Sequence, residues 1–197
     1  MKHLSIILAF LMTLSAPVAS QDFDKGLAAY SAGDYATALQ EWTPLAEAGG
    51  VDAQYNLGIM YDNGEGVPQD YKEAVKWYKL AAEQEYASSQ FNLGIMYAKG
   101  KGVLQDHKEA VKWFKLAAEQ GHDGAQSNLG AMYAKGQGVL QDHSIAHMWF
   151  NIGAANGNEL GGTNRDIVAK KMTPAAISKA QAMARECMSS KYKECGY

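Results

Sequence analysis

One segment occurs three times in this chain, and this repetition constrains the fold more than any other feature. The copies NLGIMYDNGEGVPQD, NLGIMYAKGKGVLQD and NLGAMYAKGQGVLQD begin at Asn56, Asn92 and Asn128, so the interval is 36 residues both times. A repeat of roughly 20 to 50 residues indicates a solenoid, in which each unit stacks on its neighbours. The predicted units are 53–88, 89–124 and 125–160.

Each unit is predicted to contain two helices, A and B, joined by a glycine-rich turn. Helix A of the first unit places Ala53, Leu57 and Tyr61 on one face at helical spacing. Helix B starts at Asp70, which is expected to form a capping box with Glu73. A hairpin of this size cannot bury its apolar face alone, so neighbouring hairpins must stack.

A glycine recurs inside each predicted A helix, at Gly58 in the first unit. Glycine in a helix interior costs about 1 kcal/mol relative to alanine. We therefore expect a neighbouring helix to approach so closely that a side chain would block it. The same position is occupied by Gly94 and Gly130.

The Gly-x-Gly of each turn could belong to a phosphate-binding loop or to a structural turn. A P-loop needs a strand before it and a lysine followed by serine or threonine, and this sequence has neither at the turn. The middle residue changes from Glu65 to Lys101 to Gln137, whereas the glycines stay. Because glycine tolerates positive φ, a turn between antiparallel helices is the predicted role.

The repeated pattern L-G-x-x-Y-x-x-G-x-G-V-x-x-D-x-x-x-A-x-x-W-[YF]-x-x-x-A resembles the Sel-one-like repeat family, a relative of the tetratricopeptide repeat. In the first unit it is carried by Leu57, Gly58, Tyr61, Gly64, Gly66, Val67, Asp70, Ala74, Trp77, Tyr78 and Ala82. The resemblance implies an all-α fold, an α/α superhelical solenoid of helical hairpins whose A helices line a concave face. It also implies adaptor or scaffold roles in binding other proteins.

Both ends of the chain depart from the repeat. Residues 21–52 are expected to form a shorter, tetratricopeptide-like hairpin that caps the N-terminal end. The repeat is predicted to stop after Leu160, and residues 161–197 to form C-terminal capping helices. One helix is expected over 164–172 and another from Pro174, with Thr173 as its cap.

The first twenty residues have the pattern of a secretory signal peptide. A basic start is followed by an apolar stretch and by the small residues Val18-Ala19-Ser20. The apolar stretch is short for a transmembrane anchor, which needs roughly 20 residues. We therefore expect residues 1–20 to be removed and the mature protein to be periplasmic or secreted, with no integral membrane segment.

Two cysteines, Cys187 and Cys195, remain in the expected mature chain. In an oxidising compartment pairing is the default, and this disulfide would contribute about 2–3 kcal/mol by the chain-entropy estimate. Free thiols or a bond between two chains are the alternatives. The formal net charge of −3 argues against nucleic acid as a partner.

Aligning the A helices with tetratricopeptide repeats assigns nine residues to the concave face. Exposed aromatic and aliphatic side chains in such a groove are candidates for binding a peptide or helix, although some could pack against the adjacent hairpin. Charge along this face changes from acidic to basic, which could orient a partner. The candidates are Tyr55, Ile59, Asp62, Phe91, Ile95, Lys99, Ser127, Ala131 and Lys135.

The sequence predicts no catalytic residue, no metal site and no cofactor. His143 and His147 have the i, i+4 spacing that can bind zinc, but no third ligand is near in sequence, and we expect both at the surface. The predicted function is an exported, monomeric, non-enzymatic scaffold that binds another protein or peptide. The alternatives are a cell-wall or β-lactam hydrolase, as suggested for cysteine-rich members of the family, and a structural component of an envelope assembly.

Overall fold

The computed structural model describes residues 22–193 and 195 of the 197-residue chain. The expected signal peptide lies outside these residues. The part of the chain that the structure describes contains helices and no strand, which confirms the predicted all-α fold. The helices are α1 (Phe23–Ser31), α2 (Tyr35–Glu47), α3 (Val51–Asn63), α4 (Tyr71–Glu83), α5 (Ala87–Lys99), α6 (His107–Glu119), α7 (Asp123–Lys135), α8 (His143–Ala155), α9 (Glu159–Ala169) and α10 (Pro174–Ser189).

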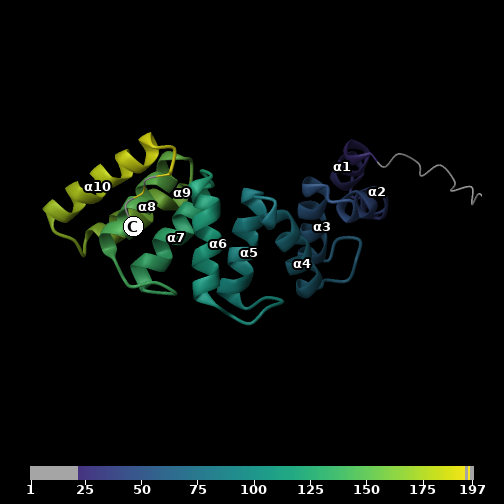
Figure 1. Ribbon diagram of the computed structural model, residues 1–197, viewed down its shortest axis with the longest axis horizontal. Coiled ribbons are helices and arrows are strands. Elements are labelled where there is room, and N and C mark those ends of the chain that lie inside the picture. Colours follow the sequence, from purple (N-terminus) through teal and green to yellow (C-terminus); the bar gives the residue numbers. More distant parts are fainter. Residues whose placement is uncertain (1–21, 194, 196–197) are drawn as a thin grey trace, which may run out of the picture.

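Consecutive helices form hairpins that stack in chain order along the long axis of the molecule, as Figure 1 shows. The hairpins α3–α4, α5–α6 and α7–α8 correspond to the three repeats, and α1–α2 precedes them. From α1 to α9, each helix packs on its neighbours in the chain. This arrangement is the α/α solenoid that the repeat predicts.

The glycine inside each A helix lies against an aromatic ring of the B helix in the same hairpin. This is the close helix approach that the recurring glycine predicts. A Cβ atom added to Gly58 would lie 2.5 Å from the ring of Tyr78, and one added to Gly94 would lie 2.7 Å from the ring of Phe114. Both aromatic residues are 1% exposed. The missing side chain therefore lets the two helices of a hairpin approach closely enough to bury the ring.

The two glycines of each turn have different roles. Gly64 has φ 76° and ends α3 in the left-handed conformation, donating its N–H to the carbonyl of Met60. The second glycine touches the preceding hairpin: a Cβ added to Gly102 would lie 2.2 Å from the backbone oxygen of Tyr71, the first residue of α4. The Gly-x-Gly is therefore both a helix stop and a stacking contact between repeats.

The variable residue between these glycines also contacts the preceding hairpin. The hydroxyl of Tyr30 in α1 donates to Glu65 at 2.6 Å. One unit later, the Lys101 ammonium lies 4.5 Å from the centre of the Tyr71 ring. The residue type changes from unit to unit, but in both of these turns its contact is with the hairpin before it.

Each B helix begins at a capping aspartate. The carboxylate of Asp70 accepts the backbone N–H groups of Lys72 and Glu73 at 2.8 and 3.2 Å. The reciprocal half of the predicted capping box is wrong, because the N–H of Asp70 donates to the carbonyl of Tyr61 in helix A. Glu73 instead forms an ion pair with Lys76. The aspartate thus caps one helix and binds the end of the other.

A buried glutamine near the start of each A helix links two hairpins. Gln90 is 2% exposed; its Nε2 donates to the carbonyl of Ala82 in α4, and its Oε1 accepts from Gln120 at the end of α6. Our reading of the sequence missed this link. The same positions are occupied in the other repeats by Gln54 with Gln84 and Gln126 with Asn156.

The first helix after the third repeat begins earlier in the chain than predicted. Helix α9 begins at Glu159, which is 36 residues after the start of α7 at Asp123, whereas the predicted helix spans 164–172. The N–H of Asn158 donates to Gly153 just as the N–H of His122 donates to Ala117 one unit earlier. Helix α9 therefore occupies the position of a fourth A helix.

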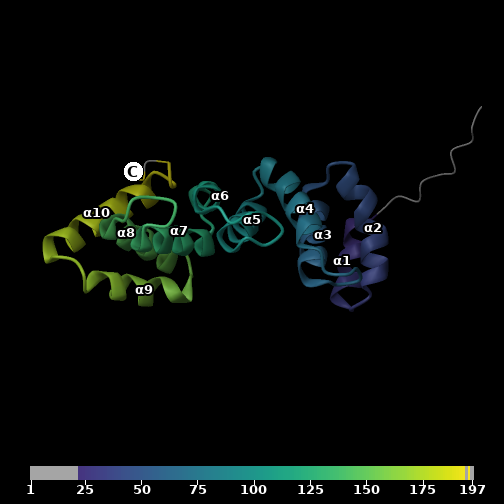
Figure 2. The same cartoon turned by 90° about the horizontal axis from the view of Figure 1, so that it is seen from below.

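Helix α10 does not complete a fourth hairpin in the repeating way. It packs against α8, and Figure 2 shows α9 and α10 on opposite sides of the α7–α8 hairpin. A disulfide joins Cys187 of α10 to Cys195, and both residues are buried. The hydroxyl of Tyr192 bonds with Asn156 at the end of α8, so the tail is anchored on the last repeat.

Candidate protein-binding surface

We define the A-helix face as the surface formed by the nine residues assigned from the sequence. They lie on α3, α5 and α7, three on each helix. Lys99 and Lys135 are exposed, Ser127 is buried and the other six are half-buried. Five apolar side chains of the face are therefore partly exposed, and its charged residues lie at the C-terminal ends of the helices.

The two aromatic residues of this face both support the hairpins and reach the surface. The Tyr55 ring lies 5.1 Å from that of Tyr86, and the Phe91 ring lies 4.5 Å from that of His122. Tyr86 and His122 are the residues at the N-cap positions of α5 and α7. Each aromatic residue therefore packs against the next A helix and leaves only part of its ring exposed.

Ser127 is not available to a partner. It is 7% exposed, and its Oγ would lie only 2.6 Å from a Cβ added to Gly153 in α8. The absence of a side chain at Gly153 leaves room for the Ser127 hydroxyl against α8. Eight of the nine residues of the A-helix face therefore remain accessible to a partner.

The charge of the A-helix face changes along the solenoid. Asp62 lies at the end of α3, and lysines end α5 and α7 at Lys99 and Lys135. Burial, and then the neighbouring Asp62 carboxylate, raise the pKa of Tyr78 well above its ordinary value. The negative charge of Asp62 therefore lies close to the buried Tyr78 ring, and the two lysines lie further toward the C-terminal end of the solenoid.

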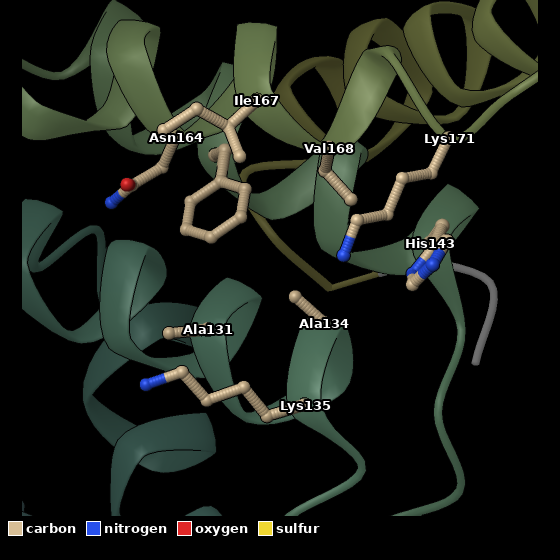
Figure 3. Close-up of a pocket in the computed structure, with 9 residues that line it drawn as sticks. Ala131, Ala134, Lys135, His143, Asn164, Ile167, Val168 and Lys171 are labelled. Carbon is tan, nitrogen blue, oxygen red and sulfur yellow. The ribbon is translucent and has the colours of Figure 1, made fainter.

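A cavity of about 280 Å³ lies at this C-terminal end, between α7, α8 and α9. Ala131 and Lys135 are residues of the A-helix face, whereas the wall formed by α9 was missed in the sequence because a fourth A helix was not recognised. The continued 36-residue spacing to Glu159 was the available signal. The cavity, drawn in Figure 3, is lined by Ala131, Ala134, Lys135, His143, Phe150, Asn164, Ile167, Val168 and Lys171.

A second hollow of about 140 Å³ continues the first along α7. The two share Ala131 and Asn164, so they form one groove between α7 and α9, which we call the α7–α9 groove. The second hollow is lined by Ser127, Asn128, Ala131, Asn158, Leu160 and Asn164. Because the Ser127 hydroxyl is buried, the polar groups of this hollow are three amide side chains.

The histidine pair on α8 is more buried than the sequence predicts. His147 is 2% exposed, so the expectation that it lies at the surface is wrong. Burial, and then the positive charge of Arg165, lower its pKa below the ordinary histidine value. No group of three or more histidine, cysteine or acidic residues that could hold a metal occurs within residues 22–193 and 195.

Comparison with protein families matches the Sel1 repeat at residues 51–86, 87–122 and 124–158, which is more than half of the chain. The chain belongs to the Sel1 repeat family. Sel1 repeats are protein–protein interaction modules, and the fold of this Sel1 repeat protein is consistent with a scaffold. No match was found among curated proteins.

Two solved structures share the fold. A Sel1 repeat protein from Oxalobacter formigenes is 27% identical, with a TM-score of 0.70 over 87% of this chain and 78% of that one. A protective antigen present in uropathogenic Escherichia coli strains, which displays an SLR fold, is 29% identical with a TM-score of 0.62. That match covers 88% of this Sel1 repeat protein and 46% of the antigen, so the chain spans less than half of its length.

None of the helices between residues 22 and 193 is long and apolar enough to cross a membrane.

Proposed function

We propose that this Sel1 repeat protein is an exported, monomeric scaffold that binds another protein through its A-helix face. The observation that carries the proposal is the set of half-buried side chains on consecutive A helices. Tyr55, Ile59, Phe91 and Ile95 repeat the same two positions on α3 and α5. Aromatic residues held rigidly at a surface lose little entropy on binding and are frequent anchors of protein interfaces.

The change of charge along the face supports a polar orientation of the partner. A segment that is basic near α3 and acidic near α7 would match Asp62 at one end and Lys99 and Lys135 at the other. Complementary charge of this kind raises association rates and selects orientation more than it adds affinity. Binding should therefore weaken with salt mainly through a slower association rate.

Export is supported by two features of the chain. The first twenty residues have the pattern of a signal peptide, and Cys187 and Cys195 are joined in a disulfide, as is usual in oxidising compartments. The similar protein of uropathogenic Escherichia coli is a protective antigen, which favours a location accessible from outside the cytoplasm. Periplasmic and secreted locations both satisfy these features.

Affinity capture from an envelope extract, with purified protein as bait, tests the proposal. The double variant Tyr55→Ala/Phe91→Ala should lose a protein that wild type recovers, and Lys99→Glu/Lys135→Glu should lose it without removing packed rings. The matched control is Leu80→Ala/Leu116→Ala, which removes exposed leucines from equivalent positions of the B helices α4 and α6. Recovery of the same proteins by wild type and by both A-helix variants would refute the proposal.

The scaffold proposal also requires that the pure protein have no hydrolytic activity. Turnover of a chromogenic β-lactam by purified wild type would contradict it. Size-exclusion chromatography of the native protein separates the monomeric scaffold from a permanent component of an envelope assembly, which would elute only in a large complex.

A further inference from the structure

The α7–α9 groove has a size and a lining that restrict what it can bind. At about 280 Å³ its main cavity lies at the small end of ligand pockets, which span roughly 300–1,000 Å³. It is too small for a nucleotide cofactor and suits one apolar side chain with a short polar group. The apolar lining is provided by Ala131, Ala134, Phe150, Ile167 and Val168.

The polar part of this cavity is cationic or neutral. Lys171 extends from the end of α9 across the cavity toward Ala134, and Lys135 runs along α7 past Ala131 (Figure 3). His143 lies at the edge, and none of the nine lining residues is acidic. The nearby Asp142 is engaged in capping α8. An apolar group that carries a carboxylate therefore matches both parts of the lining.

The second hollow favours a polypeptide over a small carboxylic acid. It is lined by Asn128, Asn158 and Asn164, and amide groups can pair with backbone N–H and C=O groups. Asn128 already donates one N–H to the carbonyl of Gly124, and its second N–H and its oxygen remain. Asn158 donates to Asp123, and its buried Oδ1 has no hydrogen-bond partner in the structure. A ligand that continues past the first cavity would thus meet groups suited to a peptide backbone.

We propose that the α7–α9 groove receives the C-terminal end of a partner polypeptide. The last side chain, apolar and about the size of leucine, enters the cavity beneath Ile167. The free α-carboxylate lies between Lys135 and Lys171, and the preceding residues follow the asparagines along α7. This inference rests on the proposed scaffold function. It specifies that the C-terminal end of the A-helix face binds the C-terminus of the partner.

Binding of short peptides to the folded, disulfide-bonded protein tests this proposal. The probes are acetylated Gly-Ser-Gly-Ser peptides that end in leucine or phenylalanine, each prepared with a free carboxylate and as the C-terminal amide. Amide resonances of Ala131, Ala134, Lys135 and Val168 in ¹H–¹⁵N spectra report binding at the groove. We expect saturable shifts with the free acids and an affinity about tenfold or more lower for the amides, because a charge-assisted contact is lost.

Charge reversal identifies the lysines that contact the carboxylate. Lys171→Glu and Lys135→Glu should each weaken binding of the free acid by about tenfold or more. The control is Lys179→Glu, which reverses the charge of an exposed lysine of α10 outside the cavity and should bind as wild type does. Unchanged melting temperatures show that the variants are folded.

Three results would overturn the proposal. Equal affinity for acid and amide would show that the carboxylate is not recognised, and absence of groove shifts with every peptide would show that no chain end binds. Tighter binding of octanoate than of the peptide acids would assign the groove to small amphiphilic acids instead. None of these results affects the capture experiment at Tyr55 and Phe91, so the scaffold function and this inference fail separately.

Discussion

Gln120 donates its side-chain amide to the Oε1 of Gln90 at 2.8 Å, which joins the end of α6 to the start of α5. The Nε2 of Gln90 donates in turn to Ala82 of the preceding hairpin. One buried side chain therefore connects three helices of two repeats. Because the same link occurs at Gln54 and Gln126, the seams between successive repeats are built alike.

Replacing Gln90 with alanine should lower the free energy of unfolding by about 2 kcal/mol. The change removes a hydrogen bond between hairpins and leaves an unfilled polar space in the buried seam. Gln120→Ala is the control, because Gln120 is exposed. This change removes the bond to Gln90 but leaves the bond between Gln90 and Ala82 in place. Urea unfolding followed by circular dichroism measures both. An effect of Gln90→Ala no larger than that of Gln120→Ala would show that the seam does not depend on this glutamine.

Adding one methyl group should have opposite effects at two helical glycines. Gly94→Ala places a Cβ 2.7 Å from the Phe114 ring and should destabilise by about 1–3 kcal/mol, despite the better helix propensity of alanine. Gly162→Ala meets no atom within 4 Å on α9 and should stabilise by about 0.5–1 kcal/mol. Thermal unfolding of both variants tests the pair, and a shift of the same sign in both would contradict the packing described for Gly94.

The repeats could be predicted from the sequence because their signals recur at a fixed interval. Gly58 indicated a close helix approach because a glycine inside a helix needs a reason, and the structure supplies the ring of Tyr78. Gln54 also recurs, but a polar residue beside an apolar stripe has no distinctive pattern, and its buried role depends on a carbonyl from the preceding hairpin. Such links between units are not visible in the sequence of one unit.

Removing the disulfide should destabilise the C-terminal region more than the rest. The double variant Cys187→Ala/Cys195→Ala should lower the free energy of unfolding by about 2–3 kcal/mol, because the unfolded tail gains freedom. Hydrogen exchange should increase in α10 and remain unchanged in α3 and α4. Adding a reductant should shift the melting temperature of wild type but not of the variant. If the reductant shifts the melting temperatures of wild type and variant equally, reduction of the Cys187–Cys195 disulfide is not the cause of the shift.

Stability should fall as the pH is lowered below about 6.5, the ordinary histidine pKa. His147 is buried in its neutral form, and its pKa in the folded state is lowered by burial and by Arg165, against a smaller opposite effect of Asp166. The unfolded chain therefore takes up a proton that the folded chain does not, which costs at most about 1.4 kcal/mol per pH unit. Burial lowers the pKa of His122 in the same direction.

Melting temperatures at pH 5.5, 7.5 and 8.5 measure this dependence. Wild type should melt lower at pH 5.5 than at 7.5, and His147→Gln should retain only the decrease that His122 causes. Between pH 7.5 and 8.5 neither histidine contributes, so that interval is the internal reference. If the decrease at pH 5.5 is the same in both proteins, His147 is not the group responsible.

The candidate site was only partly predictable. Lys135 and Ala131 were assigned by analogy with tetratricopeptide repeats, and the structure places both at the edge of a cavity. The opposite wall, with Ile167 and Lys171, was missed because α9 has lost the glycine turn and the tyrosine that mark the other A helices. Ser127 was misjudged because its burial follows from the glycine at position 153 on another helix.

Because α10 packs back onto α8, repeats can be added within the solenoid but not at its C-terminal end. A further repeat inserted between the second and third units would meet the same glutamine and glycine contacts on both sides. It would extend the A-helix face by one unit and leave the α7–α9 groove intact. A repeat added after α9 would displace α10 and its disulfide. The number of units and the terminal groove can therefore vary independently, so members of different length could bind the same chain end at different distances from Tyr55.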